Sequence, residues 1–99
     1  VRQILAFSRN EPGERRAEPL QPLVGEAVAL LETVRPPRAR LQTALAPAGV
    51  WANVNATQIH QVLMNLGTNA FQALPGGVGT VTIGVAAGAG QGADLWVAD

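Results

Sequence analysis

Residues 56–74 carry a row of side-chain amides at the spacing of one helical face. At about 100° per residue, steps of three and four positions bring these side chains into one sector of a helix; they are Gln58, Gln61, Asn65, Asn69 and Gln72. The segment contains no Asp, Glu, Lys or Arg. Glu, Lys and Arg are better helix formers and better solubilisers than Asn, so solubility alone does not explain the row.

Asn65 and Asn69 are the members of this row with the clearest chemical use. Asn is a poor helix former because its side chain competes for backbone hydrogen bonds. Its amide oxygen is a neutral, hard ligand for Mg²⁺, and its amide nitrogen can donate to a phosphate. Because Mg²⁺ shares its coordination sites with water and substrate phosphates, a few protein oxygens suffice. The spacing alone leaves two interpretations open, a metal–nucleotide contact or ordinary side-chain hydrogen bonds.

The helix that carries the row is expected to span 56–74. Asn55 is a suitable N-cap, and Pro75 followed by two glycines ends the helix. An apolar sector next to the amides should face the core; it consists of Ile59, Leu63, Leu66, Ala70 and Ala73. His60 lies outside the amide row and is expected to be a structural or surface residue.

A second helix is expected over 22–35. Pro22 suits its first turn, and the pair Pro36-Pro37 ends it. Residues 1–9 are interpreted as the end of a further helix, without a start signal of its own. The apolar stripe of the 22–35 helix recurs at three- and four-residue spacing and comprises Leu23, Ala27, Leu30, Leu31 and Val34.

Four strands complete the expected fold. Apolar and polar residues alternate, or apolar residues cluster between turn signals, at 39–46, 50–54, 79–87 and 93–98. The last two strands follow each other across a glycine-rich connection and should form a hairpin. This mixture of helices and strands predicts an α/β class of fold, specifically an α+β two-layer sandwich.

The composition excludes several kinds of site. The chain of 99 residues has no Cys and no Lys, which rules out thiolate zinc sites, a P-loop lysine and Schiff-base chemistry. A formal net charge of zero argues against nucleic-acid binding, which needs a basic surface. No apolar run approaches the ~20 residues of a membrane-spanning helix, so no direct membrane contact is expected. The absence of cysteine fits a cytoplasmic location.

The segment NLGTNAFQAL, from Asn65 to Leu74, resembles the N-box of sensor histidine kinases, whose pattern is N-L-x-x-N-A. Other segments resemble the same family in the same order. ILAFSR is similar to the end of the second helix of the dimerisation and phosphotransfer domain, and ERRAEPLQPLVGEAVALL is similar to the connector and first helix of the ATP-binding domain. LWVAD is similar to the strand that leads into the G1 box, whose pattern is D-x-G-x-G.

This resemblance implies an ATP-binding domain of the GHKL (Bergerat) type, with a mixed sheet and helices on one face. It implies that Asn69 coordinates a Mg²⁺ ion that bridges the nucleotide phosphates, and that Asn65 contacts phosphate or metal-bound water. Gln72 stands where many relatives have a basic phosphate contact, and it offers hydrogen bonds without charge. Asp99 would be the aspartate of the G1 box, which accepts a hydrogen bond from the adenine amino group and disfavours guanine.

The resemblance also implies a division into domains. Residues 1–9 would be the end of the dimerisation helix, 10–17 a linker, and 18–99 the first part of the ATP-binding domain, truncated at the G1 box. The phosphoacceptor histidine would lie upstream, and the nucleotide lid and G2 box would lie beyond Asp99. The parent would then be an ATP-dependent protein histidine kinase of a two-component system. The fragment alone would be inactive and would bind ATP weakly or not at all.

The same resemblance predicts partners. The parent would pass its phosphoryl group to a response regulator or receiver domain. Two helices would leave part of an apolar sheet face uncovered, and such a face favours a homodimer or an exchanged assembly; the face comprises Val81, Ile83, Val85, Leu95 and Val97.

Two other functions stay open from the sequence. One is a non-catalytic interaction module derived from such a domain. The other is a different GHKL ATPase, such as an anti-sigma-factor kinase or a gyrase-like ATPase. The interpretation of residues 1–9 as the end of the dimerisation helix favours the sensor kinase over these ATPases. The membrane topology of the parent does not follow from the sequence.

Overall fold

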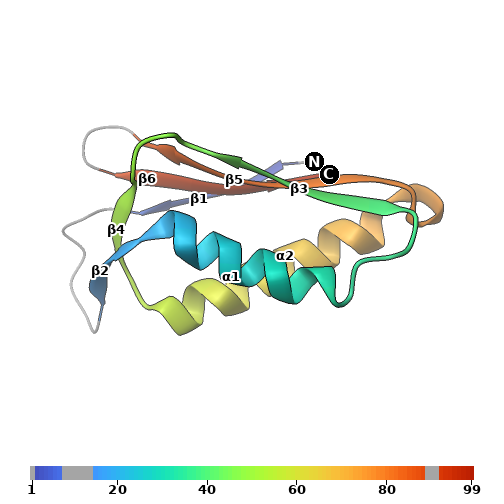
Figure 1. The fold of residues 1–99 in the computed structure, drawn as a ribbon, viewed down its shortest axis with the longest axis horizontal. Coiled ribbons are helices and arrows are strands. Elements are labelled where there is room, and N and C mark those ends of the chain that lie inside the picture. Colours follow the sequence, from blue (N-terminus) through green and yellow to red (C-terminus); the bar gives the residue numbers. More distant parts are fainter. Residues whose placement is uncertain (1, 8–14, 89–91) are drawn as a thin grey trace.

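The computed structural model describes residues 2–7, 15–88 and 92–99 of the chain. It has two layers, a four-stranded sheet and two helices, α1 (Leu20–Glu32) and α2 (Ala56–Ala73), which lie on the same face of that sheet (Figure 1). This arrangement confirms the α+β two-layer sandwich expected from the sequence. In the part of the chain that the structure describes, no helix is long and apolar enough to cross a membrane.

The main sheet has the strand order β1-β6-β5-β3. β5 and β6 form the predicted antiparallel hairpin, whereas β3 runs parallel to β5, so the sheet is mixed. Parallel neighbours need a long crossover connection, and here it contains α2. A separate two-stranded sheet pairs β2 with β4, and a short 3-10 turn, η1, follows α2. The bounds are β1 Arg2–Phe7, β2 Arg16–Pro19, β3 Ala39–Leu45, β4 Trp51–Val54, η1 Pro75–Gly77, β5 Gly79–Ala87 and β6 Ala93–Ala98.

The helix predicted over residues 1–9 is wrong where the structure describes it. Residues 2–7 form β1, which pairs antiparallel with β6. An unpaired edge on β6 would leave backbone N–H and C=O groups without partners. Pairing with β1 satisfies these groups, whereas a short isolated helix is marginal in water. The linker predicted over 10–17 is also partly wrong, because Arg16 and Ala17 belong to β2; residues 8–14 lie outside the described residues.

α1 begins and ends earlier than predicted. Its end at Glu32 is capped by Thr33, whose N–H donates to the Leu30 carbonyl at 3.1 Å and whose Oγ1 donates to the same oxygen at 2.6 Å. The predicted apolar stripe is wrong at its C-terminal end, because Leu30 is 50% exposed and Val34 is 51% exposed. Leu30 lies on the outward side of α1, and Val34 follows the end of the helix, so about half of each side chain stays exposed. The buried residues of α1 are Leu20, Leu23, Val24, Ala27 and Leu31.

α2 has the predicted start. The Asn55 side-chain oxygen accepts a hydrogen bond from the Gln58 N–H at 3.1 Å, as expected of an N-cap. The predicted core sector is displaced, however: Ala73 is exposed, and Leu66 and Ala70 are only half-buried. α1 packs against one side of α2 and shifts the buried face toward that side. The buried residues of α2 are Ile59, Leu63, Gly67 and Phe71.

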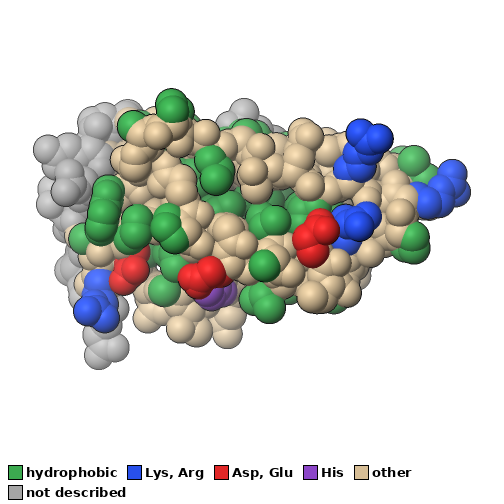
Figure 2. All heavy atoms as spheres, in the orientation of Figure 1, with side chains coloured by type: hydrophobic (Ala, Val, Ile, Leu, Met, Phe, Trp, Pro, Cys, Tyr) green, Lys and Arg blue, Asp and Glu red, His purple; other side chains and the backbone are tan. Residues whose placement is uncertain are grey.

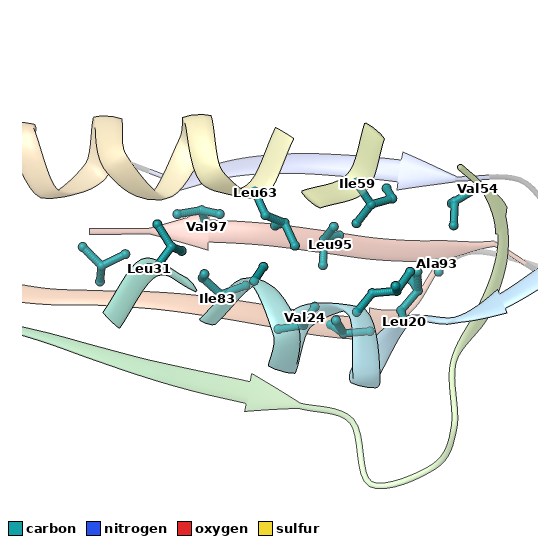
Figure 3. Packing of buried hydrophobic residues seen from close by; sticks show 14 of the residues in the cluster. Leu20, Val24, Leu31, Val54, Ile59, Leu63, Ile83, Ala93, Leu95 and Val97 are labelled. Carbon is teal, nitrogen blue, oxygen red and sulfur yellow. The ribbon is translucent and has the colours of Figure 1, made fainter. Parts of the chain in front are cut away.

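The apolar face of the sheet is fully covered, contrary to the expectation from the sequence. Its five predicted residues on β5 and β6 are each at most 3% exposed. Figure 3 shows Leu20 and Leu31 from α1, and Leu63 from α2, directed toward these strands. Two helices are therefore enough to bury this face. A homodimer stays a prediction, but an uncovered sheet face no longer supports it.

Gly67 allows α1 and α2 to pack closely. A Cβ atom at Gly67 would lie 2.6 Å from Cδ1 of Leu31, and Leu31 is completely buried. We therefore expect Gly67→Val to lower the free energy of unfolding by about 1–3 kcal/mol through overpacking. Valine is a better helix former than glycine, so propensity opposes this loss without cancelling it. Urea unfolding measures the change.

Gly25→Val is the matched control for this prediction. Gly25 is exposed on α1, and a Cβ atom there would meet nothing within 4 Å. The same substitution should leave stability unchanged or raise it by up to ~0.5 kcal/mol. If Gly67→Val is as stable as Gly25→Val, the close packing of the two helices is not as described.

Candidate functional site

The amide row lies on the face of α2 that points away from the core. All of its members are exposed, whereas Ile59 and Leu63 on the opposite side of the helix are buried. The helical period of about 3.6 residues separates these two faces. The exposed members are Gln58, Gln61, Asn65, Asn69 and Gln72.

The side chains of the key amides are unpartnered in the part of the protein that the structure describes. Across the described ranges, the side chains of Asn65, Asn69 and Gln72 form no hydrogen bond or ion pair. Thr68, which lies between the two asparagines, instead donates its hydroxyl to the backbone carbonyls of Met64 and Asn65. The interpretation that the asparagines make ordinary side-chain hydrogen bonds is therefore not supported.

Asp99 lies at the end of β6, and its side chain is exposed. α2 and β6 run in the same direction (Figure 1), and Leu63 lies between Leu95 and Val97 along the strand (Figure 3). A strand advances about 3.3 Å per residue and a helix about 1.5 Å. Asp99 is therefore level with the turn of α2 that follows Asn65. The structure thus groups the three amides on one exposed face of α2 and places Asp99 at a similar level along the axis, at the end of β6, which lies on the opposite, buried side of the helix.

The electrostatics of α2 suit a neutral metal contact. The helix contains no Asp, Glu, Lys or Arg, and the lower rim of the molecule, over α2, carries few charged side chains (Figure 2). Among residues 2–7, 15–88 and 92–99, no group of three or more His, Cys, Asp or Glu could hold a metal ion. A divalent cation at α2 would therefore be bound by amide oxygens together with ligand phosphates. That donor set fits Mg²⁺, which usually keeps several waters and shares its sites with phosphates.

His60 lies away from the amide face. It is half-buried on the side of α2 that faces α1, and its Nε2 lies 3.8 Å from Oε2 of Glu26. This distance is too long for a hydrogen bond, and Nε2 is buried without one. His60 thus belongs to the contact between the two helices and not to the candidate site.

Gln21 makes a positioning contact that the sequence analysis did not single out. Its Nε2 donates to the Ala48 carbonyl at 2.8 Å, and its Oε1 accepts from the Val50 N–H at 3.0 Å. These bonds fix the connection between β3 and β4, and β4 leads directly to Asn55 and the start of α2. No local signal could have revealed this contact, because the two partners are 29 positions apart.

Comparison with known proteins supports the fold. No family model matches the sequence, and no curated protein matches it significantly. The structure, in contrast, is similar to the catalytic domain of the histidine kinase ThkA in a nucleotide-free form, with a TM-score of 0.60. The match covers 86% of this chain and 95% of that chain at 14% sequence identity. The chain therefore has the fold of a histidine kinase catalytic domain, as the sequence resemblance implied.

Proposed function

We propose that this chain is the Mg²⁺–ATP-binding part of an ATP-dependent protein histidine kinase, and that the exposed amide face of α2 contacts the nucleotide. The observation that carries this proposal is the row of Asn65, Asn69 and Gln72, whose side chains have no partner among the described residues. Asparagine weakens a helix interior, and here it gains no bond within the described protein. A ligand that takes up these bonds explains why such residues stand at these positions. The shared fold supports the same assignment.

Each residue has a separate role in this proposal. Asn69 supplies an amide oxygen to Mg²⁺, and Asn65 contacts phosphate or metal-bound water. Gln72 donates a hydrogen bond to phosphate, and Asp99 accepts from the adenine amino group. The bound Mg²⁺ neutralises phosphate charge, which favours phosphoryl transfer. In the parent, the γ-phosphoryl group passes to a histidine and then to a response regulator or receiver domain.

One sequence argument for a sensor kinase is lost. The segment ILAFSR resembles the end of a dimerisation helix, but its described part is a strand here. The segment therefore no longer distinguishes the sensor kinase from a non-catalytic module or another GHKL ATPase. Only a measurement of activity distinguishes them. A non-catalytic module predicts no Mg²⁺-dependent nucleotide contact at α2. Another GHKL ATPase predicts the same contact with a different phosphoryl acceptor.

An NMR titration with ATP, with and without Mg²⁺, tests the proposal. Of the two outcomes expected from the sequence, weak binding or none, the proposal commits to weak binding, so the titration extends to millimolar nucleotide. The side-chain NH₂ signals of Asn65 and Asn69 and the backbone signal of Asp99 should shift, and the shifts of the asparagines should require Mg²⁺. Gln58 should not respond, since it lies about 16 Å from Asn69 along the helix axis. Shifts that are absent, or that lie on the opposite face of the sheet, would overturn the proposal.

A homodimer is proposed with a direct test of its own. The sheet face is covered and cannot drive dimerisation. The remaining argument for a dimer is that the edge strands of the main sheet, β1 and β3, have unpaired outer edges in the described structure. Sedimentation at micromolar concentration distinguishes a monomer from a homodimer. A monomer with a cooperative thermal transition would rule out a dimer of this chain.

A further inference from the structure

The pairing of β1 with β6 ends next to Asp99. Arg2 lies opposite Ala98, and Gln3 lies opposite Val97. On the other side of β6, the ladder with β5 also reaches Ala98. The last residues before Asp99 are therefore held between two strands. The residues of β1 that pair with them are the first residues of that strand.

The hydrogen-bond pattern shows which residues of β6 depend on β1. The Gly88 N–H donates to the Gly92 carbonyl at 2.9 Å, so this opposite pair is a hydrogen-bonded one. Hydrogen-bonded and non-hydrogen-bonded pairs alternate along an antiparallel ladder. The backbone groups of Trp96 and Ala98 therefore point toward β5, and those of Leu95 and Val97 point toward β1. Val97 is the last of these before Asp99.

β1 itself is held mainly through this ladder. It is one of the two edge strands of the sheet, and the Ile4 side chain at its middle is 55% exposed. Without β1, β6 would become the edge strand. Backbone groups at an edge open more easily than those inside a sheet. The end of β6, and Asp99 with it, would then lose one of its two supports.

We propose that β1 is a positioning strand for Asp99. Its backbone bonds to Val97 hold the end of β6, and with it the Asp99 carboxylate, where that group can accept from the adenine amino group. This inference rests on the proposed function, because it concerns the adenine contact. It predicts that β1 controls the choice of base, whereas phosphate and Mg²⁺ binding depend on Asn65 and Asn69 of α2.

Two proline variants of β1 separate this role from a general loss of stability. The Gln3 N–H points toward β6, so Gln3→Pro removes a ladder hydrogen bond next to Asp99. The Ile4 N–H points away from β6, so Ile4→Pro should be tolerated at this edge strand. The dissociation constants for ATP and GTP are measured for both variants by NMR titration. In the same samples, amide hydrogen exchange is measured at Val97 and Trp96.

In the unaltered chain we expect a preference for ATP and protected amides at both positions. In Gln3→Pro, the ratio of the GTP to the ATP dissociation constant should fall about tenfold, as for one lost hydrogen bond to a charged group. Val97 should lose protection while Trp96 keeps it. Ile4→Pro should retain both the selectivity and the protection. A change in stability alone would not alter the ratio of two affinities.

Several outcomes would overturn this inference. An unprotected Val97 amide in the unaltered chain would show that β1 does not hold β6. Unchanged selectivity in Gln3→Pro, with Val97 deprotected, would show that β1 does not position Asp99. Equal loss of selectivity in both proline variants would show that the ladder bond is not the cause. No nucleotide binding by the unaltered chain would instead overturn the proposed function, and this inference with it.

Discussion

Replacing Asn69 by alanine is expected to weaken Mg²⁺–ATP binding by about ten- to a hundredfold while slightly raising the stability of the chain. A hydrogen bond or metal contact to a charged group contributes about 1.5–3 kcal/mol, which corresponds to that change in affinity. Stability should rise by up to ~0.7 kcal/mol, because alanine is the better helix former and the exposed Asn69 side chain bonds to nothing in the described protein.

The opposite signs of the two effects make this prediction specific. A substitution that reduces binding by damaging the fold lowers affinity and stability together. NMR titration gives the affinity, and urea unfolding gives the stability of the same protein. In the proposed parent kinase, Asn69→Ala should nearly abolish autophosphorylation, and Asn65→Ala should have a smaller effect because Asn65 is proposed to be a secondary contact.

Gln58→Ala is the matched control. Gln58 belongs to the same exposed amide row but lies about three turns from Asn69. Its removal should leave affinity unchanged. Asn69→Asp adds a second test, because a carboxylate can still bind Mg²⁺ but repels the phosphates, so binding should be altered and not simply lost. Normal Mg²⁺-dependent binding by Asn69→Ala would remove Asn69 from the metal site.

The features that could be predicted from sequence depend on local signals. Asn55 and Pro75 define α2 to within a residue, because capping and helix termination are decided by neighbouring positions. The hairpin of β5 and β6 follows from two alternating segments joined by a short connection. The exposed amide row could likewise be found from helical periodicity alone.

The features that the sequence did not predict depend on contacts between distant segments. β1 is a strand because β6 offers an edge, and nothing near residues 2–7 indicates that edge. Leu30 and Leu31 look equivalent in sequence, but one is half-exposed and the other fully buried, because only Leu31 meets α2 at Gly67. The sequence analysis also underestimated how much of the apolar sheet face the two helices bury, because this burial depends on how closely the helices pack.

The candidate site also has one part that depends on local signals and one part that depends on contacts between distant segments. The common face of Asn65, Asn69 and Gln72 is a local property of one helix and follows from spacing. The level of Asp99 relative to these amides depends on how β6 packs against α2, so its part in the site could be inferred only from a resemblance. The helix packing that creates this arrangement involves Leu63, which joins α2 to the sheet on the side opposite the amides.

Leu63→Ala should therefore lower the free energy of unfolding by about 2–5 kcal/mol, the usual range for a leucine removed from a core. Leu63 is completely buried and lies over Leu95 and Val97 of β6 (Figure 3). Its truncation removes apolar contacts and leaves a cavity between α2 and the sheet. A loss of this size is a large part of the 5–15 kcal/mol typical of a whole domain, so the variant should unfold at a clearly lower urea concentration.

Leu30→Ala is the matched control, because it makes the same leucine-to-alanine change at an exposed position. Leu30 is 50% exposed on α1, so the same truncation should change stability by no more than about 0.5 kcal/mol. The folded fraction of Leu63→Ala should still show nucleotide-dependent shifts at Asn65 and Asn69, because these side chains lie on the opposite side of α2. If the two leucine variants unfold at the same urea concentration, α2 is not packed on β6 as described. The level assigned to Asp99 along the axis of α2 would then be wrong as well, since it was derived from the same Leu63 contact.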